Sequence, residues 1–257
     1  MTLQQKSKLN RLMTMVPEGL PVTAAWLKQE VGVSRQLVQD YVKNGWLANP
    51  TRGVYVRNPA KLTWLSALLA VQWIEGRKCY PTGESALRLL GFGQYIPMGK
   101  GSEQGLGGPE RPPLWLDRLE LEVSFRYAEK TLFANEELGM TTFPVPGYEQ
   151  ALQIPTAARA ILEMLAGVRD EDRFRAAYEL FEGMTSLSPN QVQSLLVDCR
   201  HIKAKRLFMM LLDWVGHAWG RHLDREALDL GSGKRVVVKG GKLNAKYGVT
   251  VPEGFHD

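Results

Sequence analysis

The feature that most constrains the fold is a pair of short helical patterns within residues 22–56, separated by a single glycine. Thr23 can cap a first helix that ends before Gly32, which supplies the turn. Ser34 can cap a second helix, and Gly45 is placed to end it. The apolar residues of both segments have the spacing that packs one helix against the other. The pattern predicts a helix-turn-helix.

Two short strand patterns follow the second helix, at Trp46–Leu47 and Gly53–Val56, with a turn between them. They predict a β-hairpin, which in this position is a wing. Arg52 lies at the predicted tip of the wing, and Arg57 follows its second strand. We expect both side chains to contact phosphate groups or the minor groove. The N-terminal part is therefore predicted to be a winged helix-turn-helix.

The outward face of the second predicted helix carries residue types that read DNA. Arg and Gln form paired hydrogen bonds with guanine and adenine edges in the major groove, and Lys reaches phosphate groups. A three-helix module that binds protein and has lost its DNA surface is the alternative. The predicted DNA-binding residues are Ser34, Arg35, Gln36, Gln39, Lys43, Arg52 and Arg57.

The distribution of charge favours the DNA-binding interpretation. The net charge is +5, but residues 1–95 hold 12 Lys and Arg against 5 Asp and Glu, whereas residues 96–257 hold 20 against 22. A basic module joined to a body of the opposite balance is typical of a nucleic-acid-binding protein with a second task. A basic face that is merely solvated would give the same count.

Membrane and secreted classes are excluded by simple patterns. The longest apolar stretches, residues 64–74 and 207–219, are interrupted by polar residues and fall short of the roughly 18 residues that a membrane span needs. The N-terminal segment lacks the layout of a secretory signal. Cys79 and Cys199 provide neither a disulfide framework nor a zinc site. We expect a soluble cytoplasmic protein with no membrane partner.

One glycine-rich motif, Gly231–Arg235, invites an enzymatic interpretation because such turns can bind anions through backbone N–H groups. A nucleotide-binding P-loop, however, needs a further glycine where Leu228 stands, and Ser or Thr where Arg235 stands. The four histidines form no compact set of metal ligands. We therefore predict no enzyme activity, no cofactor and no bound metal.

The hydrophobic patterns predict an α+β chain: a winged helix-turn-helix domain over residues 1–58, and a second domain over residues 59–257. The second domain divides into a mixed α/β part, residues 59–154, and a helical part with a terminal β-hairpin, residues 155–257. Pro97–Pro113 is rich in glycine and proline and is predicted to be a loop. Helices are predicted at Lys61–Glu75, Thr82–Leu90, Thr156–Ala166, Asp170–Met184, Pro189–Asp198 and His201–Trp219, a strand at Leu119–Arg126, and the hairpin at Arg235–Lys239 with Tyr247–Val251.

Several segments together resemble the AbiEi family, the antitoxins of bacterial type IV toxin–antitoxin systems of the abortive-infection kind. Thr156–Arg159 departs from the family pattern, which has an acidic residue after the proline. The resembling segments are AWLKQEVGVSRQLVQDYVKNGWLANPTRGVYVR, GESALRLLGFGQYI, IPTAARAILEML, LSPNQVQSLLVDCRHIKAKRLFMMLLDWVGHAW and LDLGSGKRVVVKGGKLNAKYGVTVP.

The resemblance implies two functions. The winged helix would repress the operon that encodes antitoxin and toxin, by binding inverted repeats in promoter DNA. The C-terminal domain would neutralise an AbiEii-type nucleotidyltransferase toxin, with direct contact between the two proteins left open. Two alternatives are a winged-helix regulator with a ligand-sensing C-terminal domain and a nucleotide-dependent enzyme tethered to DNA.

A dense group of basic residues in the C-terminal part is the candidate antitoxin surface. It would meet an acidic or phosphate-bearing partner, whereas a solvated start of the predicted helix is the alternative interpretation. Its residues are Lys203, Lys205, Arg206, Lys234 and Arg235.

Overall fold

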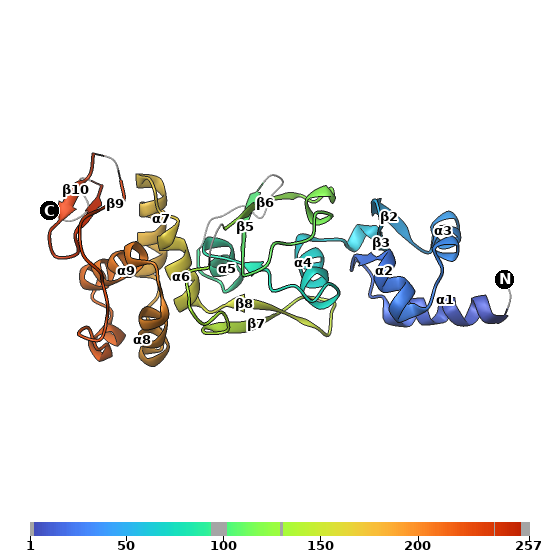
Figure 1. Cartoon of the computed structure of the whole chain (residues 1–257), viewed down its shortest axis with the longest axis horizontal. Helices are drawn as coiled ribbons and strands as arrows, with labels where there is room; N and C mark the ends of the chain where they lie inside the picture. The colour runs from blue at the N-terminus through green and yellow to red at the C-terminus, as the bar shows by residue number, and fades with distance from the viewer. Residues whose placement is uncertain (1–2, 94–101, 129–130, 239, 253–257) are drawn as a thin grey trace.

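The structure is a computed structural model that describes residues 3–93, 102–128, 131–238 and 240–252. The chain passes through three parts in sequence order along one long axis, with the winged helix at one end and a small terminal sheet at the other (Figure 1). The α+β class and the order of the predicted parts are confirmed.

The N-terminal part contains both predicted helices of the helix-turn-helix. The side chain of Thr23 caps the first, and Ser34 Oγ caps the second by accepting a hydrogen bond from the backbone N–H of Leu37 at 3.2 Å. Gly32 lies between them with φ of +76°, a conformation that suits glycine. The elements are α1 (Leu3–Met15), β1 (Val22–Thr23), α2 (Ala24–Trp26) continued by a π-helical turn (Leu27–Val31), α3 (Arg35–Lys43), β2 (Ala48–Thr51) and β3 (Val54–Val56).

The wing is confirmed as an antiparallel pair of strands, but its first strand, Ala48–Thr51, occupies residues predicted to be the turn, and the predicted strand Trp46–Leu47 lies just before it. Strands β2 and β3 pair with each other, and β1 adds to the far side of β3, so the sheet order is β1-β3-β2. Helix α1 was not predicted from the hydrophobic pattern. Its residue Leu12 is fully buried in the same apolar cluster as Leu27 and Tyr41, so α1 completes the core of the winged helix.

The middle part is mixed, as predicted, and contains two small sheets. One has the order β4-β5-β6, with β5 and β6 parallel; the other is the antiparallel hairpin β7-β8, which the sequence patterns did not indicate. The elements are α4 (Trp64–Trp73), β4 (Tyr80–Pro81), α5 (Glu84–Leu89), β5 (Ser102–Gly107), β6 (Val123–Tyr127), β7 (Met140–Pro144) and β8 (Ala151–Pro155).

The prediction that Pro97–Pro113 is a loop is wrong for its central stretch, because β5 is the middle strand of a sheet. All prolines of the described stretch lie outside the strand, so none interrupts its hydrogen bonds. A Cβ atom on Gly107 would lie 3.2 Å from Thr82 Cβ, so glycine here permits a close approach between segments. Residues 97–101 lie outside the described part.

The C-terminal part is built on four helices at the predicted positions. Helix α9 is buried on all sides from Ala204 to Leu212 and forms the centre of the part. It ends at Gly216, which has φ of +73°, before the predicted end at Trp219. The helices are α6 (Ala157–Ala166), α7 (Glu171–Glu182), α8 (Pro189–Asp198) and α9 (Ile202–Val215).

The terminal hairpin exists, but with different strands from those predicted. Strand β10 (Lys242–Asn244) pairs antiparallel with β11 (Val249–Val251), and β9 (Arg235–Val236) joins β11 in parallel. The Gly240–Gly241 turn therefore does not join the two arms directly. The pattern of alternating residues cannot distinguish parallel from antiparallel pairing. Lys239 lies outside the described residues.

The buried apolar side chains form two clusters. One joins the winged helix to the middle part, including Leu27, Leu68 and Ile154, and the other lies among the C-terminal helices. The first cluster continues past residue 58, so the domain boundary predicted there stays a prediction. No helix in the described ranges has the length and hydropathy to cross a membrane.

Candidate nucleic-acid interface

The exposed face of α3 carries the predicted DNA-reading side chains. Ser34 fixes the start of the helix, and Arg35, Gln36, Gln39 and Lys43 are all exposed. The opposite face is buried through Leu37, Val38 and Tyr41. The helix is thus held by its apolar face while its polar face is open to a major groove.

Two hydrogen bonds organise this polar face. Gln39 Nε2 donates to Tyr55 Oη at 3.2 Å, which links α3 to strand β3 of the wing. Gln36 Nε2 donates to Asp40 Oδ1 at 3.4 Å, one turn along the same helix. Within the described ranges, neither Arg35 nor Lys43 forms an ion pair, so both charges are available to DNA.

Arg52 lies at the tip of the wing, as predicted. The turn is fixed by Asn49, whose Nδ2 donates to the carbonyls of Thr51 and Val54 at 2.7 Å each, and by Gly53 with φ of +79°. Arg52 itself is exposed, and no described carboxylate pairs with it. A rigid turn therefore presents an unpaired guanidinium group.

Arg57 has a structural role that the sequence did not indicate. Its Nη1 donates to the carbonyls of Met13 and Val16 at 2.6 Å each, and its Nη2 lies 3.7 Å from Glu18 Oε1. These carbonyls are at the end of α1, where the helix leaves them without partners. Because its guanidinium group forms hydrogen bonds within the fold, Arg57 is not part of the candidate interface.

The candidate antitoxin surface needs a correction. Lys205 and Arg206 are only 3% and 5% exposed, because α9 is buried on all sides rather than along one stripe. Arg206 donates to the carbonyls of Leu230, Gly231 and Gly233, at 2.6, 2.9 and 2.5 Å. Lys205 and Arg206 therefore cannot present a surface to a partner, and Arg206 instead holds the glycine-rich turn in place.

The other three residues of that candidate surface differ among themselves. Lys203 is half-buried, and its Nζ donates to the carbonyl of Val168 at 2.7 Å. Lys234 and Arg235 are exposed, next to the turn that Arg206 holds through the carbonyl of Gly233. Only these last two remain as an exposed basic pair.

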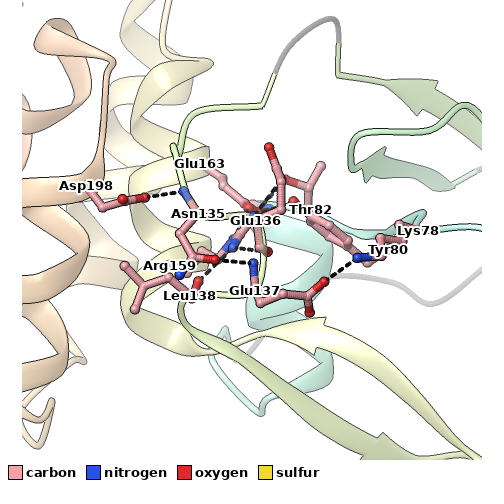
Figure 2. Close-up of polar contacts among 11 residues, drawn as sticks. Lys78, Tyr80, Thr82, Asn135, Glu136, Glu137, Leu138, Arg159, Glu163 and Asp198 are labelled. Carbon is pink, nitrogen blue, oxygen red and sulfur yellow. Dashed lines mark hydrogen bonds and ion pairs between the residues drawn. The ribbon is translucent and has the colours of Figure 1, made fainter.

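A buried polar cluster joins the middle part to the C-terminal helices, centred on Arg159 (Figure 2). Arg159 is completely buried on α6, and its Nη2 donates to Tyr80 Oη at 2.6 Å while its Nε donates to Glu163 Oε1 at 3.1 Å. Its Nη1 donates to the carbonyls of Glu136 and Leu138, at 2.8 and 2.7 Å. Arg159 therefore binds three segments together.

Glu163 extends this cluster to the wall of a large cleft. It accepts hydrogen bonds from Thr82 Oγ1 and from the backbone N–H of Gly83, at 2.5 and 3.1 Å. Burial raises the pKa of Tyr80, which stays a neutral hydrogen-bonding phenol. The i,i+4 spacing of Arg159 and Glu163 is the one sequence signal that could have revealed the cluster.

The cleft lies between the middle part and the C-terminal helices and has a volume of about 1070 Å³. Its walls come from α5 and the segment before it, from β5 and β6, from the end of α6, from the start of α7 and from the residues just before α9. No group of three or more His, Cys, Asp or Glu side chains that could hold a metal ion occurs in the described part of the chain.

Comparisons with known proteins match both halves of the chain to one family. Residues 105–252 match the family model described as "Transcriptional regulator, AbiEi antitoxin, Type IV TA system", and residues 5–98 match its N-terminal domain. The solved structure of RV2827C protein from Mycobacterium tuberculosis is similar in fold, with a TM-score of 0.62 and 16% identity over 98% of this chain and 92% of that chain. Comparison with curated proteins gave no match.

Proposed function

The chain belongs to the AbiEi antitoxin family, transcriptional regulators of type IV toxin–antitoxin systems, and we propose that it represses its own operon and neutralises an AbiEii-type nucleotidyltransferase toxin. The observation that carries the first part is the exposed polar face of α3 beside a rigid wing with an unpaired arginine at its tip. That surface has the shape and chemistry to read a major groove and hold the flanking phosphates.

In this proposal, the first turns of α3 recognise the bases. Arg35 suits guanine, and Gln36 and Gln39 suit adenine, because each offers two hydrogen-bonding atoms to one base edge. Gln39 retains this capacity while bound to Tyr55, since its Nε2 carries a second hydrogen and its Oε1 is free to accept. Lys43 and Arg52 lie at the end of α3 and at the wing tip, where they can hold phosphates on either side.

Repression through inverted repeats requires two winged helices, one on each half-site. A gel-shift titration with promoter DNA from upstream of the operon tests this. We expect a fragment with both repeats to bind two chains, and a fragment with one repeat scrambled to bind one chain with lower affinity. Equal binding to scrambled DNA of the same length would contradict sequence-specific repression.

Neutralisation of the toxin is supported by the family and by the exposed pair Lys234 and Arg235. Coexpression with the neighbouring nucleotidyltransferase gene, scored as growth rescue, tests it. Charge reversal at both residues to Glu should weaken rescue at matched protein level, because an acidic or phosphate-bearing partner would be repelled. Reversal at two separate exposed arginines, Arg118 and Arg221, is the control; full rescue by both variants would place the antitoxic surface elsewhere.

A regulator that senses a small ligand is the second candidate, and the large cleft favours it. This candidate predicts that a ligand releases the protein from promoter DNA, whereas an autorepressing antitoxin needs no such ligand. The two are separated by gel-shift titration in the presence and absence of a ligand that occupies the cleft.

A further inference from the structure

The walls of the cleft carry more positive than negative charge. Among the described residues that line it, five are arginines and three are glutamates. Each glutamate already has an arginine partner: Glu84 and Arg88 are 2.6 Å apart, and Glu103 and Arg126 are also 2.6 Å apart. Glu163 pairs at 3.1 Å with the buried Arg159, which stands behind the wall. Each carboxylate of the cleft is therefore already paired with an arginine of this chain.

Three arginines of the cleft remain after this pairing. Arg169 and Arg200 are exposed, and neither has a carboxylate partner among the residues that the structure places. Arg173 lies 3.7 Å from Asp170, which does not line the cleft, and both side chains are about half exposed. Three guanidinium groups thus line one concave surface without a buried counter-charge.

Neutral donors lie on the same surface. The Nδ1 atom of His201 accepts a hydrogen bond from the backbone N–H of Ala204, so the neutral ring carries its proton on Nε2. Burial, together with the nearby charge of Lys203, lowers the pKa of His201 and keeps the ring neutral near pH 7. His201 and the hydroxyl of Thr131 both line the cleft and can donate to an anion.

We propose that this cleft binds a ligand with two or more phosphate groups, held chiefly by Arg169, Arg173 and Arg200. The planar guanidinium group donates two parallel hydrogen bonds to a phosphate, which suits arginine better than lysine to this task. A phosphate also brings up to two negative charges to one point, whereas a carboxylate brings one. The volume of the cleft, about 1070 Å³, accommodates a nucleotide as well as its phosphates.

The phosphates could belong to a free nucleotide or to a nucleic-acid strand, and the choice of probe distinguishes these sources. Isothermal titration of the full chain with ATP, with inorganic tripolyphosphate and with a single-stranded oligothymidylate, at one ionic strength, gives the affinity for each. Binding of ATP or tripolyphosphate would identify the ligand as a free polyphosphate. Binding of the oligonucleotide alone, with the same dependence on the cleft arginines, assigns a strand.

Paired variants locate the binding. Arg169→Gln with Arg200→Gln should weaken the affinity at least about tenfold, because each removes a charge-assisted contact. Arg118→Gln with Arg221→Gln removes the same charge from exposed positions outside the cleft and should change the affinity less than about twofold. Both variants should retain the wild-type affinity for promoter DNA, which separates this site from the winged helix.

A second measurement does not depend on a variant. Phenylglyoxal modifies accessible arginines, and the bound probe should protect Arg169 and Arg200 but not Arg118, as read by mass spectrometry of peptides. Protection together with selective loss in the cleft variant supports the proposal. The proposal is overturned if no probe binds, if both double variants lose affinity equally, or if Arg118 is protected as strongly as the cleft arginines.

Discussion

Gln39 on the recognition helix donates a hydrogen bond to the phenol oxygen of Tyr55 on the wing, across 3.2 Å. Tyr55 is 5% exposed, so its ring position is fixed by the core while its hydroxyl reaches Gln39 on the exposed polar face of α3. The bond holds a predicted base-reading amide in one orientation before DNA arrives. Preorganisation of this kind reduces the entropy that binding would otherwise lose.

Tyr55→Phe tests this relationship because it removes only the hydroxyl. The affinity for promoter DNA should fall by about 1 kcal/mol, or roughly fivefold, while the affinity for random DNA stays the same. Fluorescence anisotropy with labelled fragments measures both. An unchanged promoter affinity would show that the bond between Gln39 and Tyr55 does not position the amide.

Arg52→Ala should act differently, because a wing-tip arginine holds a phosphate rather than a base. Affinity for promoter and random DNA should fall together, and the slope of log affinity against log salt should decrease by about one. Arg118→Ala, in the middle part, is the matched control. If the salt slope of the Arg52 variant equals that of the wild type, the wing tip makes no phosphate contact.

Arg206→Ala should destabilise the protein strongly, although exposed arginines tolerate the same change. Removal of the guanidinium group leaves the carbonyls of Leu230, Gly231 and Gly233 without their partner and opens a cavity beside α9. The free energy of unfolding in urea should fall by about 3 kcal/mol or more. Arg221→Ala should change it by no more than about 0.5 kcal/mol; equal effects would contradict the structural role of Arg206.

Asp213 makes the stability of the C-terminal part depend on pH in the acidic range. Burial alone would raise the pKa of its carboxyl, but hydrogen bonds from Lys246, Tyr247 and Arg225 outweigh burial and lower the pKa below its ordinary value of 3.8. The ionised carboxylate thus stabilises the fold above the pKa of the unfolded chain. This stabilisation is lost as the pH falls through the lower pKa of the folded state.

Urea unfolding of wild type and Asp213→Asn from pH 7 to pH 2.5 measures this effect. The difference in stability between the two proteins should be full at neutral pH and shrink below about pH 4. Glu149→Gln, at an exposed carboxyl for which the structure shows no partner, is the control and should differ little from wild type throughout. A difference that stays constant to pH 2.5 would rule out a lowered pKa at Asp213.

Helix caps and glycine turns could be predicted from the sequence, because they depend on residues that are neighbours in the chain. Ser34 and Gly32 mark the limits of the two helices of the helix-turn-helix because capping and positive φ depend on neighbours in the sequence. Helix α8 begins at the predicted Pro189 for the same reason. The polar face of α3 could likewise be predicted from its spacing alone.

Features that depend on distant contacts were missed. Composition indicated a loop where the structure has a central strand. Gly107 lets that strand approach Thr82 closely, and this contact joins residues that are far apart in the sequence. The burial of Arg206 and the engagement of Arg57 at the end of α1 both depend on carbonyl partners from other segments. A basic residue in a sequence indicates a charge, but only the fold shows whether it is on the surface.

The most direct test of the central claim is a comparison of promoter and random DNA for the wild type and for Arg35→Ala and Gln36→Ala, titrated at one salt concentration. Both side chains are exposed on α3, so neither substitution should alter the fold. We predict that each costs about 1 to 3 kcal/mol of affinity for promoter DNA and much less for random DNA. Equal losses on both DNAs, or no loss on either, would contradict base reading by the recognition helix.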